Sequence, residues 1–453
     1  MIRLRYHDGT LVAEGATTED LPPGFVMDDR IGHPRGSAWF YPQTVLHLLS
    51  EGHDFEDVAR QWGRLDDLQH LAERTARPYQ REAIDAWLDS GRRGAVILPT
   101  GTGKTFVAEL AIAEARRPTL VIAPTLDLVG QWHDRLHTAF GQPIGILGGG
   151  HHEVHDLTVS TYDSAYIHMG RYGDRFGLLI FDEVHHLPAP GYLTAAENSM
   201  APFRLGLTAT WEREDGAEDE LWDLLGPVVY RKEITELRGE WLADYETIRL
   251  TVHLGPEERA RYDAARGAFR SFVARKKIRL GGPNGWHRFL QSAARSRDGR
   301  AAFKAYQESR RISHGTEQKL DLLGTLLEEE WGRRTIIFTH DNATAYRISR
   351  EFLVPCISHQ TDVKERRKIL KAFESGELPV LATSRVLNEG VDLPAAEVAI
   401  VLSGTGTVRE HVQRLGRILR PGPDKQAVLY ELVAAGTSEE QASERRRQHD
   451  AWR

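Results

Sequence analysis

The sequence contains a single cysteine, Cys356, among its 453 residues. One thiol excludes an intrachain disulfide, a cysteine-built zinc site and an iron–sulfur cluster, because each of these needs several thiol groups. The chain also lacks any window that approaches 18 apolar residues. Its first fifteen residues, which we expect to form two short strands and a turn, have no apolar signal-peptide core. We therefore expect a cytoplasmic protein.

The chain has no overall excess of positive charge, since 58 Lys and Arg against 65 Asp and Glu give a formal net charge of −7. A surface for a polyanion must therefore be a local patch. Residues 255–315 supply one, with fifteen Lys and Arg against five Asp and Glu in a mostly helical pattern that is broken at 281–285. Aromatic residues are interleaved with these cations, namely Phe269, Phe272, Trp286, Phe289, Phe303 and Tyr306. The rings either stack on nucleic-acid bases or form the core of a helical unit with a basic outer face.

Short apolar runs alternate with helical patterns in two parts of the chain. The runs lie at 94–101, 119–125, 157–162, 176–183 and 203–210, and again at 335–340, 378–384, 397–403 and 427–433. Strands that are apolar on both faces are typical of a parallel sheet covered by helices. The sequence therefore predicts an α/β protein with parallel-sheet domains at 73–235 and 236–453, the second of which contains the basic helical insertion at 255–315. Residues 1–72 are predicted to form a small α+β domain.

The stretch LPTGTGKT at 98–105 lies between a predicted strand and the helical stretch FVAELAIAEA, which is the context of a phosphate-binding loop. Gly101 and Gly103 let backbone N–H groups turn toward phosphate oxygens at a helix N-terminus. Lys104 is expected to reach the β- and γ-phosphates, and Thr105 to ligate Mg²⁺. Leu98 stands where the strict motif has glycine, so the match is to a shorter form. The nucleotide-binding residues of this loop are Thr100, Gly101, Thr102, Gly103, Lys104 and Thr105.

The strand in FGLLIFDEVHH ends in two carboxylates, Asp182 and Glu183. Open parallel sheets bind ligands at the carboxyl ends of their strands. Asp182 is expected to hold Mg²⁺ and Glu183 to orient or deprotonate the attacking water. An acidic loop is the alternative, but the phosphate loop makes it the weaker interpretation. Together the two motifs predict an enzyme that hydrolyses a nucleoside triphosphate.

HHEVH at 151–155 is similar to a zinc-protease string. His152 and His155 are three residues apart instead of four, and the segment follows GGG and precedes a strand, so the helix that the motif requires is missing. We therefore expect no metal site at this segment.

EHVQRLGRILRPG at 410–422 places Gln413, Arg417 and Arg420 in one helical neighbourhood. Arg417 and Arg420 are three apart and share a face. Planar, permanently charged donors of this kind stabilise charge that develops on a γ-phosphate. Because they lie in the second domain, hydrolysis requires the two domains to close on each other. A solvated basic helix is the alternative.

The order of these motifs resembles that of superfamily-2 helicases, over about residues 75–435. The resemblance implies two RecA-like domains, adenine contact by Arg77 and Gln80, and nucleotide contact by Gly390 and Asp392. It also implies a set of nucleic-acid-contacting and coupling residues at the ends of strands, namely Thr125, Thr161, His185, Thr208, Thr210 and Thr383.

Within that superfamily the chain resembles XPB-type helicases. Arg213-Glu214-Asp215 matches an Arg-Glu-Asp element beside the DNA path, DEVHH matches the acidic motif, and residues 255–315 match a helical "thumb" insertion. Residues 27–49 resemble the segment that joins a damage-recognition domain to the motor. A plain charged surface loop remains the alternative for 213–215.

The resemblance implies an ATP- and Mg²⁺-dependent 3′–5′ DNA helicase or translocase that acts in DNA repair. Its substrate would be single-stranded or forked DNA, with a structure-specific nuclease as a candidate partner and no membrane. Three alternatives stay open: a duplex translocase like restriction-enzyme motors, a nucleotide-gated nucleic-acid scaffold, and an RNA motor.

Overall fold

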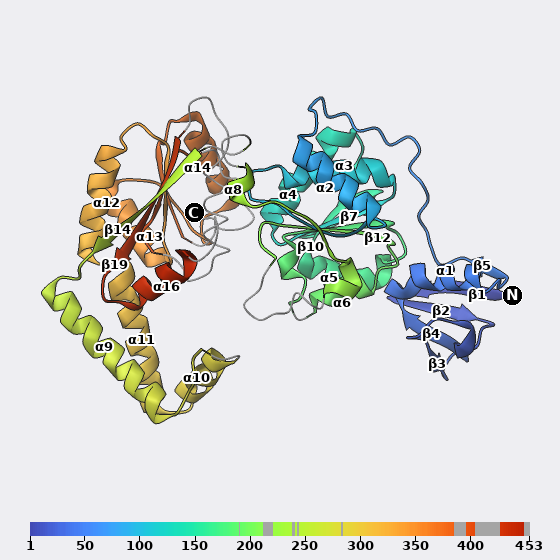
Figure 1. The fold of residues 1–453 in the computed structure, drawn as a ribbon, viewed down its shortest axis with the longest axis horizontal. Coiled ribbons are helices and arrows are strands. Elements are labelled where there is room, and N and C mark those ends of the chain that lie inside the picture. Colours follow the sequence, from blue (N-terminus) through green and yellow to red (C-terminus); the bar gives the residue numbers. More distant parts are fainter. Residues whose placement is uncertain are drawn as a thin grey trace. The chain divides into compact units, whose positions relative to one another are not determined.

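The computed structural model describes residues 1–189, 191–211, 221–237, 241, 244–281, 284–384, 396–403 and 426–447. The chain divides into two compact units, 1–232 and 233–453, which are described separately below (Figure 1). Among the described residues, no helix is both long enough and apolar enough to cross a membrane. The domain boundaries expected from the sequence stay predictions.

The first unit begins with a small α+β domain. Its five strands have the order β3-β4-β2-β1-β5, with all neighbours antiparallel except β1 and β5. The expectation of two initial strands joined by a turn is confirmed. One face of β1 alternates into the core at Ile2 and Leu4, as a half-buried strand requires. The elements are β1 (Ile2–His7), β2 (Thr10–Glu14), β3 (Val26–Asp28), β4 (His33–Ser37), α1 (Tyr41–Ser50) and β5 (Phe55–Asp57).

The rest of the first unit is built on an eight-stranded sheet of order β13-β6-β12-β11-β7-β10-β8-β9. Every pairing is parallel except that of β8 with β9, which confirms the predicted sheet type. All five runs expected here are strands. The strands are β6 (Arg93–Ile97), β7 (Thr119–Ala123), β8 (Ile144–Gly148), β9 (His151–His152), β10 (Leu157–Thr161), β11 (Leu178–Asp182), β12 (Phe203–Thr208) and β13 (Val228–Arg231).

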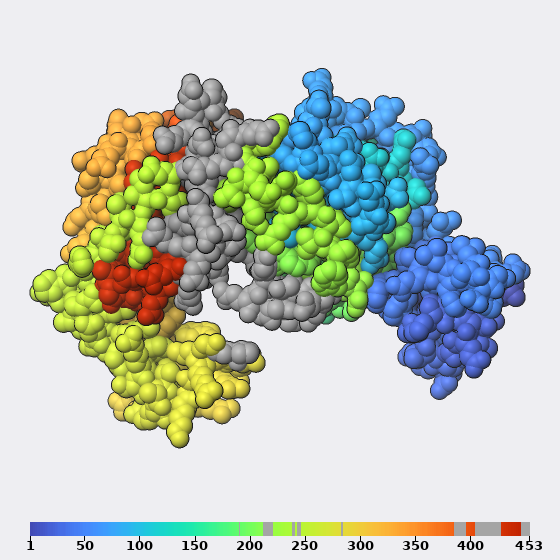
Figure 2. All heavy atoms as spheres, in the orientation of Figure 1, coloured from blue at the N-terminus to red at the C-terminus, as the bar shows by residue number. Residues whose placement is uncertain are grey.

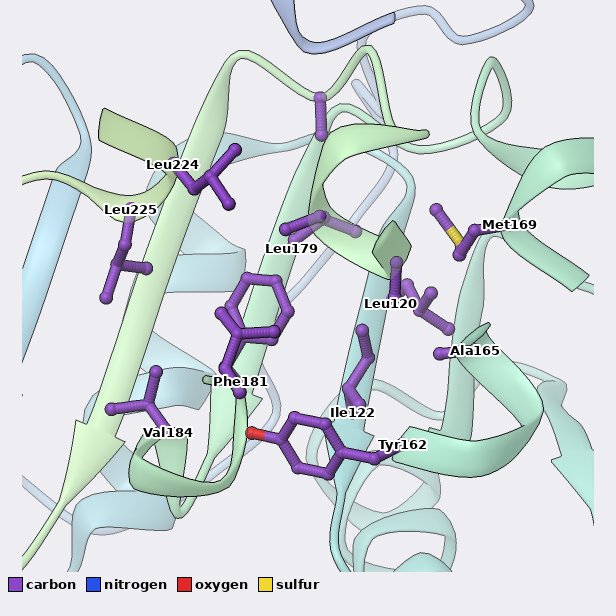
Figure 3. Packing of buried hydrophobic residues seen from close by; sticks show 14 of the residues in the cluster. Leu120, Ile122, Tyr162, Ala165, Met169, Leu179, Phe181, Val184, Leu224 and Leu225 are labelled. Carbon is purple, nitrogen blue, oxygen red and sulfur yellow. The ribbon is translucent and has the colours of Figure 1, made fainter. Parts of the chain in front are cut away.

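Helices cover both faces of this sheet. Figure 1 shows α2, α3 and α4 on one face and α5 and α6 on the other. The apolar side chains of β7 and β11 pack against α5, and the Tyr162 hydroxyl points toward the turn that follows β11 (Figure 3). The helices are α2 (Pro78–Asp89), α3 (Lys104–Ala115), α4 (Leu126–Phe140), α5 (Tyr162–Tyr172), α6 (Tyr192–Glu197) and α7 (Leu221–Leu225).

The small domain is hydrogen-bonded to the rest of the first unit. The Tyr6 hydroxyl lies 2.8 Å from Met169 O, 2.8 Å from Gly170 O and 3.0 Å from Asn198 O. Gly173 permits this approach, because a Cβ there would stand 2.4 Å from the Tyr6 oxygen. Because the contact joins residues more than 160 positions apart, no local sequence pattern predicts it.

The second unit contains a six-stranded sheet of order β14-β19-β18-β15-β17-β16, in which all pairings are parallel as predicted. Its strands are β14 (Asp244–Val252), β15 (Thr335–Phe338), β16 (Cys356–Ile357), β17 (Val380–Thr383), β18 (Val398–Val401) and β19 (Gln426–Ala434). Its helices are α8 (Ile234–Leu237), α12 (Glu317–Glu329), α13 (Asn342–Phe352), α14 (Val363–Ser375) and α16 (Ser438–Arg447), besides three that form an insertion.

That insertion, here called the thumb, consists of α9 (Pro256–Arg275), α10 (Gly285–Ala294) and α11 (Arg297–His314). Helices α9 and α11 run side by side, and α10 folds back at the end remote from the sheet (Figures 1 and 2). Phe269, Phe272 and Phe289 form the buried core of the thumb. Of the two interpretations of these three rings, core formation is confirmed, and the prediction that they stack on bases is wrong for this conformation. Trp286 differs, because it remains 40% exposed.

Candidate nucleotide site and nucleic-acid surface

The predicted phosphate loop follows β6 and leads directly into α3, as its sequence context requires. Gly101 and Gly103 have φ values of +87° and +86°. A Cβ at Gly103 would also stand 2.6 Å from Gln80 Nε2, so glycine is needed there on two counts. Lys104 Nζ donates to Leu98 O at 3.1 Å and thereby folds back over the loop. The Thr100 hydroxyl is buried and has no hydrogen-bond partner among the described residues. This backbone geometry is the one that a phosphate-binding loop requires, and phosphate binding itself stays a prediction.

The start of α2 is fastened to this loop. Gln80 is buried, its Nε2 donates to Thr102 O at 2.9 Å, and its Oε1 accepts from Arg77 N at 3.0 Å. The Tyr79 hydroxyl donates to Thr102 O at 2.6 Å and accepts from Arg77 Nη1 at 3.0 Å. The structure thus brings Arg77 and Gln80 to the phosphate loop. Their contact with adenine stays a prediction.

The carboxylate pair ends β11 two strands away from β6 in the same sheet. Asp182 is buried; its Oδ2 accepts from Trp132 Nε1 at 2.8 Å and its Oδ1 from Glu183 N at 3.0 Å. Burial raises the pKa of the Asp182 carboxyl, and the charge of Glu183 raises it further, while the Trp132 bond and the Lys104 charge oppose the shift. The positive charge near Asp182 is therefore too small to offset its burial and the charge of Glu183.

Glu183 adopts left-handed backbone angles, φ 47° and ψ 55°, which are costly for a residue with a Cβ. Such strain concentrates at functional sites, where surrounding contacts enforce it. Here the left-handed conformation turns the chain sharply after β11 and places the Glu183 side chain beside the end of β12.

A polar network joins the ends of β11 and β12. The buried His185 has Nδ1 3.0 Å from Thr208 Oγ1 and 3.5 Å from Glu183 Oε2. Thr208 Oγ1 in turn lies 3.4 Å from Glu183 Oε2 and 2.8 Å from Thr210 O. The structure therefore brings Glu183, predicted to act on the attacking water, together with His185, Thr208 and Thr210, which the resemblance assigns to nucleic-acid contact and coupling.

The remaining strand-end threonines have local structural partners. Thr125 and Thr161 are the N-caps of α4 and α5, where their hydroxyls accept from Leu128 N and Ser164 N. Thr383 is fully buried, and its hydroxyl lies 3.2 Å from Ile357 O. In this conformation the Thr383 hydroxyl holds the end of β17, and its contact with a nucleic-acid backbone stays a prediction.

Several expected site residues lie outside the described part of the chain. They are Arg213, Glu214, Asp215, Gly390, Asp392, Gln413, Arg417 and Arg420. At the HHEVH segment His151–His152 form the short strand β9, and the described residues contain no group of three or more His, Cys, Asp or Glu that could hold a metal.

Sequence reasoning missed two features of the site. One is Trp132, because its bond to Asp182 joins residues fifty positions apart. The other is the buried Glu109 of α3, which pairs with Arg74 at 3.1 Å, His70 at 3.3 Å and Arg135. An acidic residue within the apolar FVAELAIAEA stretch was the only local signal for it.

Three family descriptions match the chain. Residues 4–59 match the Xeroderma pigmentosum group B helicase damage recognition domain, residues 73–213 the type III restriction enzyme res subunit, and residues 318–422 the helicase conserved C-terminal domain. Among solved structures, the Pyrococcus furiosus Hef helicase domain has a TM-score of 0.54 at 18% identity, over 82% of this chain and 98% of that one. S. cerevisiae Dbp5 bound to RNA and ADP BeF3 has a TM-score of 0.57 at 14% identity, over 82% and 86%. The fold is that of paired RecA-like domains, and the chain is an ATP-hydrolysing enzyme of helicase superfamily 2.

Two relatives assign the chain to one family within this superfamily. The DNA 3′-5′ translocase XPB2 of Sulfurisphaera tokodaii is 39% identical over 451 residues, which cover 99% of this chain and 100% of the relative. The DNA 3′-5′ helicase XPB of Kineococcus radiotolerans is 32% identical over 87% of this chain and 66% of its own length. The chain belongs to the XPB family, and the resemblance found in its motifs is confirmed.

Proposed function

We propose that the chain uses ATP hydrolysis to move 3′ to 5′ along DNA and to open duplexes during DNA repair. One observation carries the proposal: the phosphate loop and the Asp182–Glu183 pair lie at the carboxyl ends of strands in one parallel sheet, where such sheets bind ligands. Relatives are named as DNA 3′-5′ helicases or translocases, which supports DNA and this direction. The match to a damage recognition domain supports a role in repair.

In this proposal the loop residues 100–105 hold the phosphates of ATP, and Arg77 and Gln80 flank its adenine. The Lys104 ammonium exchanges Leu98 O for the β- and γ-phosphates. Gly390 and Asp392 would complete the nucleotide contacts from the second RecA-like domain.

The donor set fits a magnesium ion. Asp182 and Glu183 are adjacent carboxylates, and burial together with the Glu183 charge disfavours the charged form of Asp182, so a divalent cation would relieve that penalty. Thr105 and Asp182 would hold the ion, which when bound supplies charge neutralisation at the phosphates. Glu183 orients the attacking water and accepts its proton. Gln413, Arg417 and Arg420 would stabilise the charge that develops on the γ-phosphate.

Coupling to DNA would start at the network of Glu183, His185, Thr208 and Thr210, because its members bridge the strands that end at the hydrolytic carboxylates. Thr125 and Thr161 lie at strand ends of the same sheet as that network, and Thr383 lies at a strand end of the second unit's sheet. We assign these strand ends to the path of the DNA. Arg213, Glu214 and Asp215 follow β12 in sequence and would support strand separation.

A separate nuclease would cut the opened DNA. Within the described residues there is no acidic or histidine cluster able to hold metal ions for strand cleavage. A structure-specific nuclease that recognises forked DNA is therefore the partner we propose.

Substitution Lys104→Ala tests the ATP site. Without the ammonium the γ-phosphate loses its principal cation, so we expect ATP turnover to vanish. Turnover would be measured for both proteins with single-stranded DNA, forked duplex and RNA across a salt series. Stimulation by DNA, and its steep decline with salt, is expected for the unsubstituted chain. Retained turnover in the variant, or equal stimulation by RNA, would contradict the proposal.

A second candidate function is translocation along duplex DNA without strand separation. It is favoured by the name of the 39%-identical relative, a translocase, and by the match to a restriction-enzyme motor subunit. A strand-displacement assay and a triplex-displacement assay on the same duplex distinguish the two functions. Triplex displacement alone would favour this candidate.

A further inference from the structure

The side chain of Trp132 is hydrogen-bonded to the carboxylate of Asp182. It is 3% exposed, and its Nε1 donates to Asp182 Oδ2 at 2.8 Å. The other oxygen, Oδ1, accepts from Glu183 N at 3.0 Å. Each Asp182 oxygen therefore has one fixed protein donor, and the orientation of the carboxylate plane is set on both sides. A carboxylate oxygen has a second lone pair, so both oxygens keep the capacity to bind a ligand.

Trp132 belongs to α4, whose N-terminus lies at the carboxyl end of β7, the parallel neighbour of β11. Thr125 at the carboxyl end of β7 caps this helix, and Trp132 lies within its second turn. Helix α4 is also tied to α3, the helix that starts at Lys104, through the ion pair of Arg135 with the buried Glu109. These contacts connect the N-terminus of α4 to the Trp132 ring and to the helix that follows the phosphate loop.

A buried indole N–H always needs an acceptor, so the bond to Asp182 has a purely structural explanation as well. The same domain holds a direct comparison. Trp87 of α2 is fully buried, and its Nε1 donates to the backbone carbonyl of Arg204 at 3.0 Å. Satisfying an indole thus requires no carboxylate. Trp132 instead donates to the one side chain whose orientation decides how a metal ion is held.

We propose that Trp132 is a positioning residue, which orients Asp182 for the magnesium ion of bound ATP and carries DNA contact at the start of α4 to the hydrolytic site. The inference rests on the proposed function, since it assumes that Asp182 ligates this ion. Groups that orient a metal ligand typically affect metal affinity or activity by about 10–100-fold. The effect of losing this donor should therefore be seen in the dependence on magnesium and should be weak in nucleotide binding itself.

The test compares Trp132→Phe with Trp87→Phe. Each substitution keeps a buried aromatic ring and removes one indole hydrogen bond, but only the first bond reaches Asp182. Three quantities would be measured for each: the affinity for ADP in EDTA, the magnesium concentration at half-maximal ATP turnover, and the ratio of turnover with and without single-stranded DNA.

We expect Trp132→Phe to bind ADP in EDTA as the unsubstituted chain does, to need about tenfold more magnesium, and to lose most of its stimulation by DNA. Trp87→Phe should leave all three quantities unchanged. Trp132→His, whose neutral ring keeps one N–H donor, should regain part of the magnesium affinity. This second variant also serves if the phenylalanine variant folds poorly.

Equal magnesium requirements in the two phenylalanine variants would overturn the proposal. A raised magnesium requirement with normal stimulation by DNA would overturn transmission through α4. Failure of the proposed function is recognised separately, because the unsubstituted chain would then show no DNA-stimulated turnover at all.

Discussion

At the scale of single residues, burial has decided the chemistry of groups that look alike in the sequence. Asp182 and Glu183 are adjacent, yet one carboxylate is fixed by two donors while the other sits on a strained left-handed turn beside Thr208 and His185. This division gives one acid a ligand's fixed orientation and leaves the other next to a polar network. It is the arrangement that separate metal-binding and water-activating roles require.

The only thiol is governed by the same physics. Burial raises the pKa of Cys356 from 9.0 to about 11. Since the thiolate is the nucleophile, we expect alkylation by iodoacetamide at pH 8 to be about a hundredfold slower than for free cysteine, and to accelerate only as the pH approaches 11. The fold favours the neutral thiol, so this group's contribution to stability is complete below pH 9 and is lost as the pH rises through 11. Mass spectrometry of the native protein checks the rate, with the unfolded chain as control. Rapid native labelling would contradict it.

At the scale of elements, the thumb separates its aromatic residues into an inner and an outer group. The inner rings of Phe269, Phe272 and Phe289 hold α9, α10 and α11 together. On the outer side Trp286 packs against Phe289 and Tyr306 in tilted arrangements, with ring centroids 5.0 and 4.8 Å away. A half-exposed ring supported from behind, in a strongly basic segment, is suited to stack on an unpaired base.

Trp286→Ala tests this surface. Loss of one base-stacking platform costs about 1–3 kcal/mol, so affinity for single-stranded DNA should fall by about 5- to 150-fold. Leu290→Ala is the matched control, since Leu290 lies on the same helix and is 38% exposed, against 40% for Trp286. Fluorescence anisotropy with a labelled oligonucleotide measures both variants. Equal losses would indicate that only apolar surface matters.

The second unit fixes its C-terminal helix by a buried ion pair. Lys319 of α12 donates to Glu439 of α16 at 2.7 and 2.9 Å and to Leu402 O at 2.6 Å, and both side chains are buried. Breaking such a pair leaves an uncompensated buried charge. Figure 2 shows α16 lying against α9, where Arg259 donates to Gly436 O at 3.0 Å. The thumb and the sheet of this unit are thus joined through α16.

At the scale of the whole molecule, each unit combines a RecA-like sheet with an accessory element. In the first unit, the small domain is attached to the motor by the Tyr6 hydroxyl and by Gln61, whose Nε2 donates to Asp174 at 2.7 Å. The carbonyls that Tyr6 meets lie at the end of α5 and just after α6. A movement of the small domain would therefore act on the helices that cover one face of the sheet.

Tyr6→Phe is expected to loosen this attachment. Removing the hydroxyl removes the single O–H donor that these carbonyls share and should cost about 1–3 kcal/mol. Hydrogen exchange should therefore accelerate both in β1 and at the C-terminal end of α5. Tyr41→Phe is the matched control, because Tyr41 donates to Asp57 at 2.6 Å within the small domain. That variant should leave α5 unaffected, and identical exchange at α5 in both variants would contradict the role of Tyr6.

The sequence by itself determined the parallel sheets, the phosphate loop, the strand-end carboxylates and the family. These features are local: a phosphate loop needs only consecutive residues between a strand and a helix, and a buried parallel strand needs only a short apolar run. The position of each motif after a strand also indicated that the motifs lie together, because the carboxyl ends of all strands in a parallel sheet lie at the same edge.

Tertiary structure alone decided which side chains meet. Only folding brought Trp132 to Asp182 and Tyr6 to the end of α5, since those contacts span 50 and more than 160 residues. It also turned Phe289 into the thumb core and left Trp286, three residues earlier, at the surface. Composition could not separate the two, because burial depends on which neighbouring helix covers a side chain, and no local pattern contains that information.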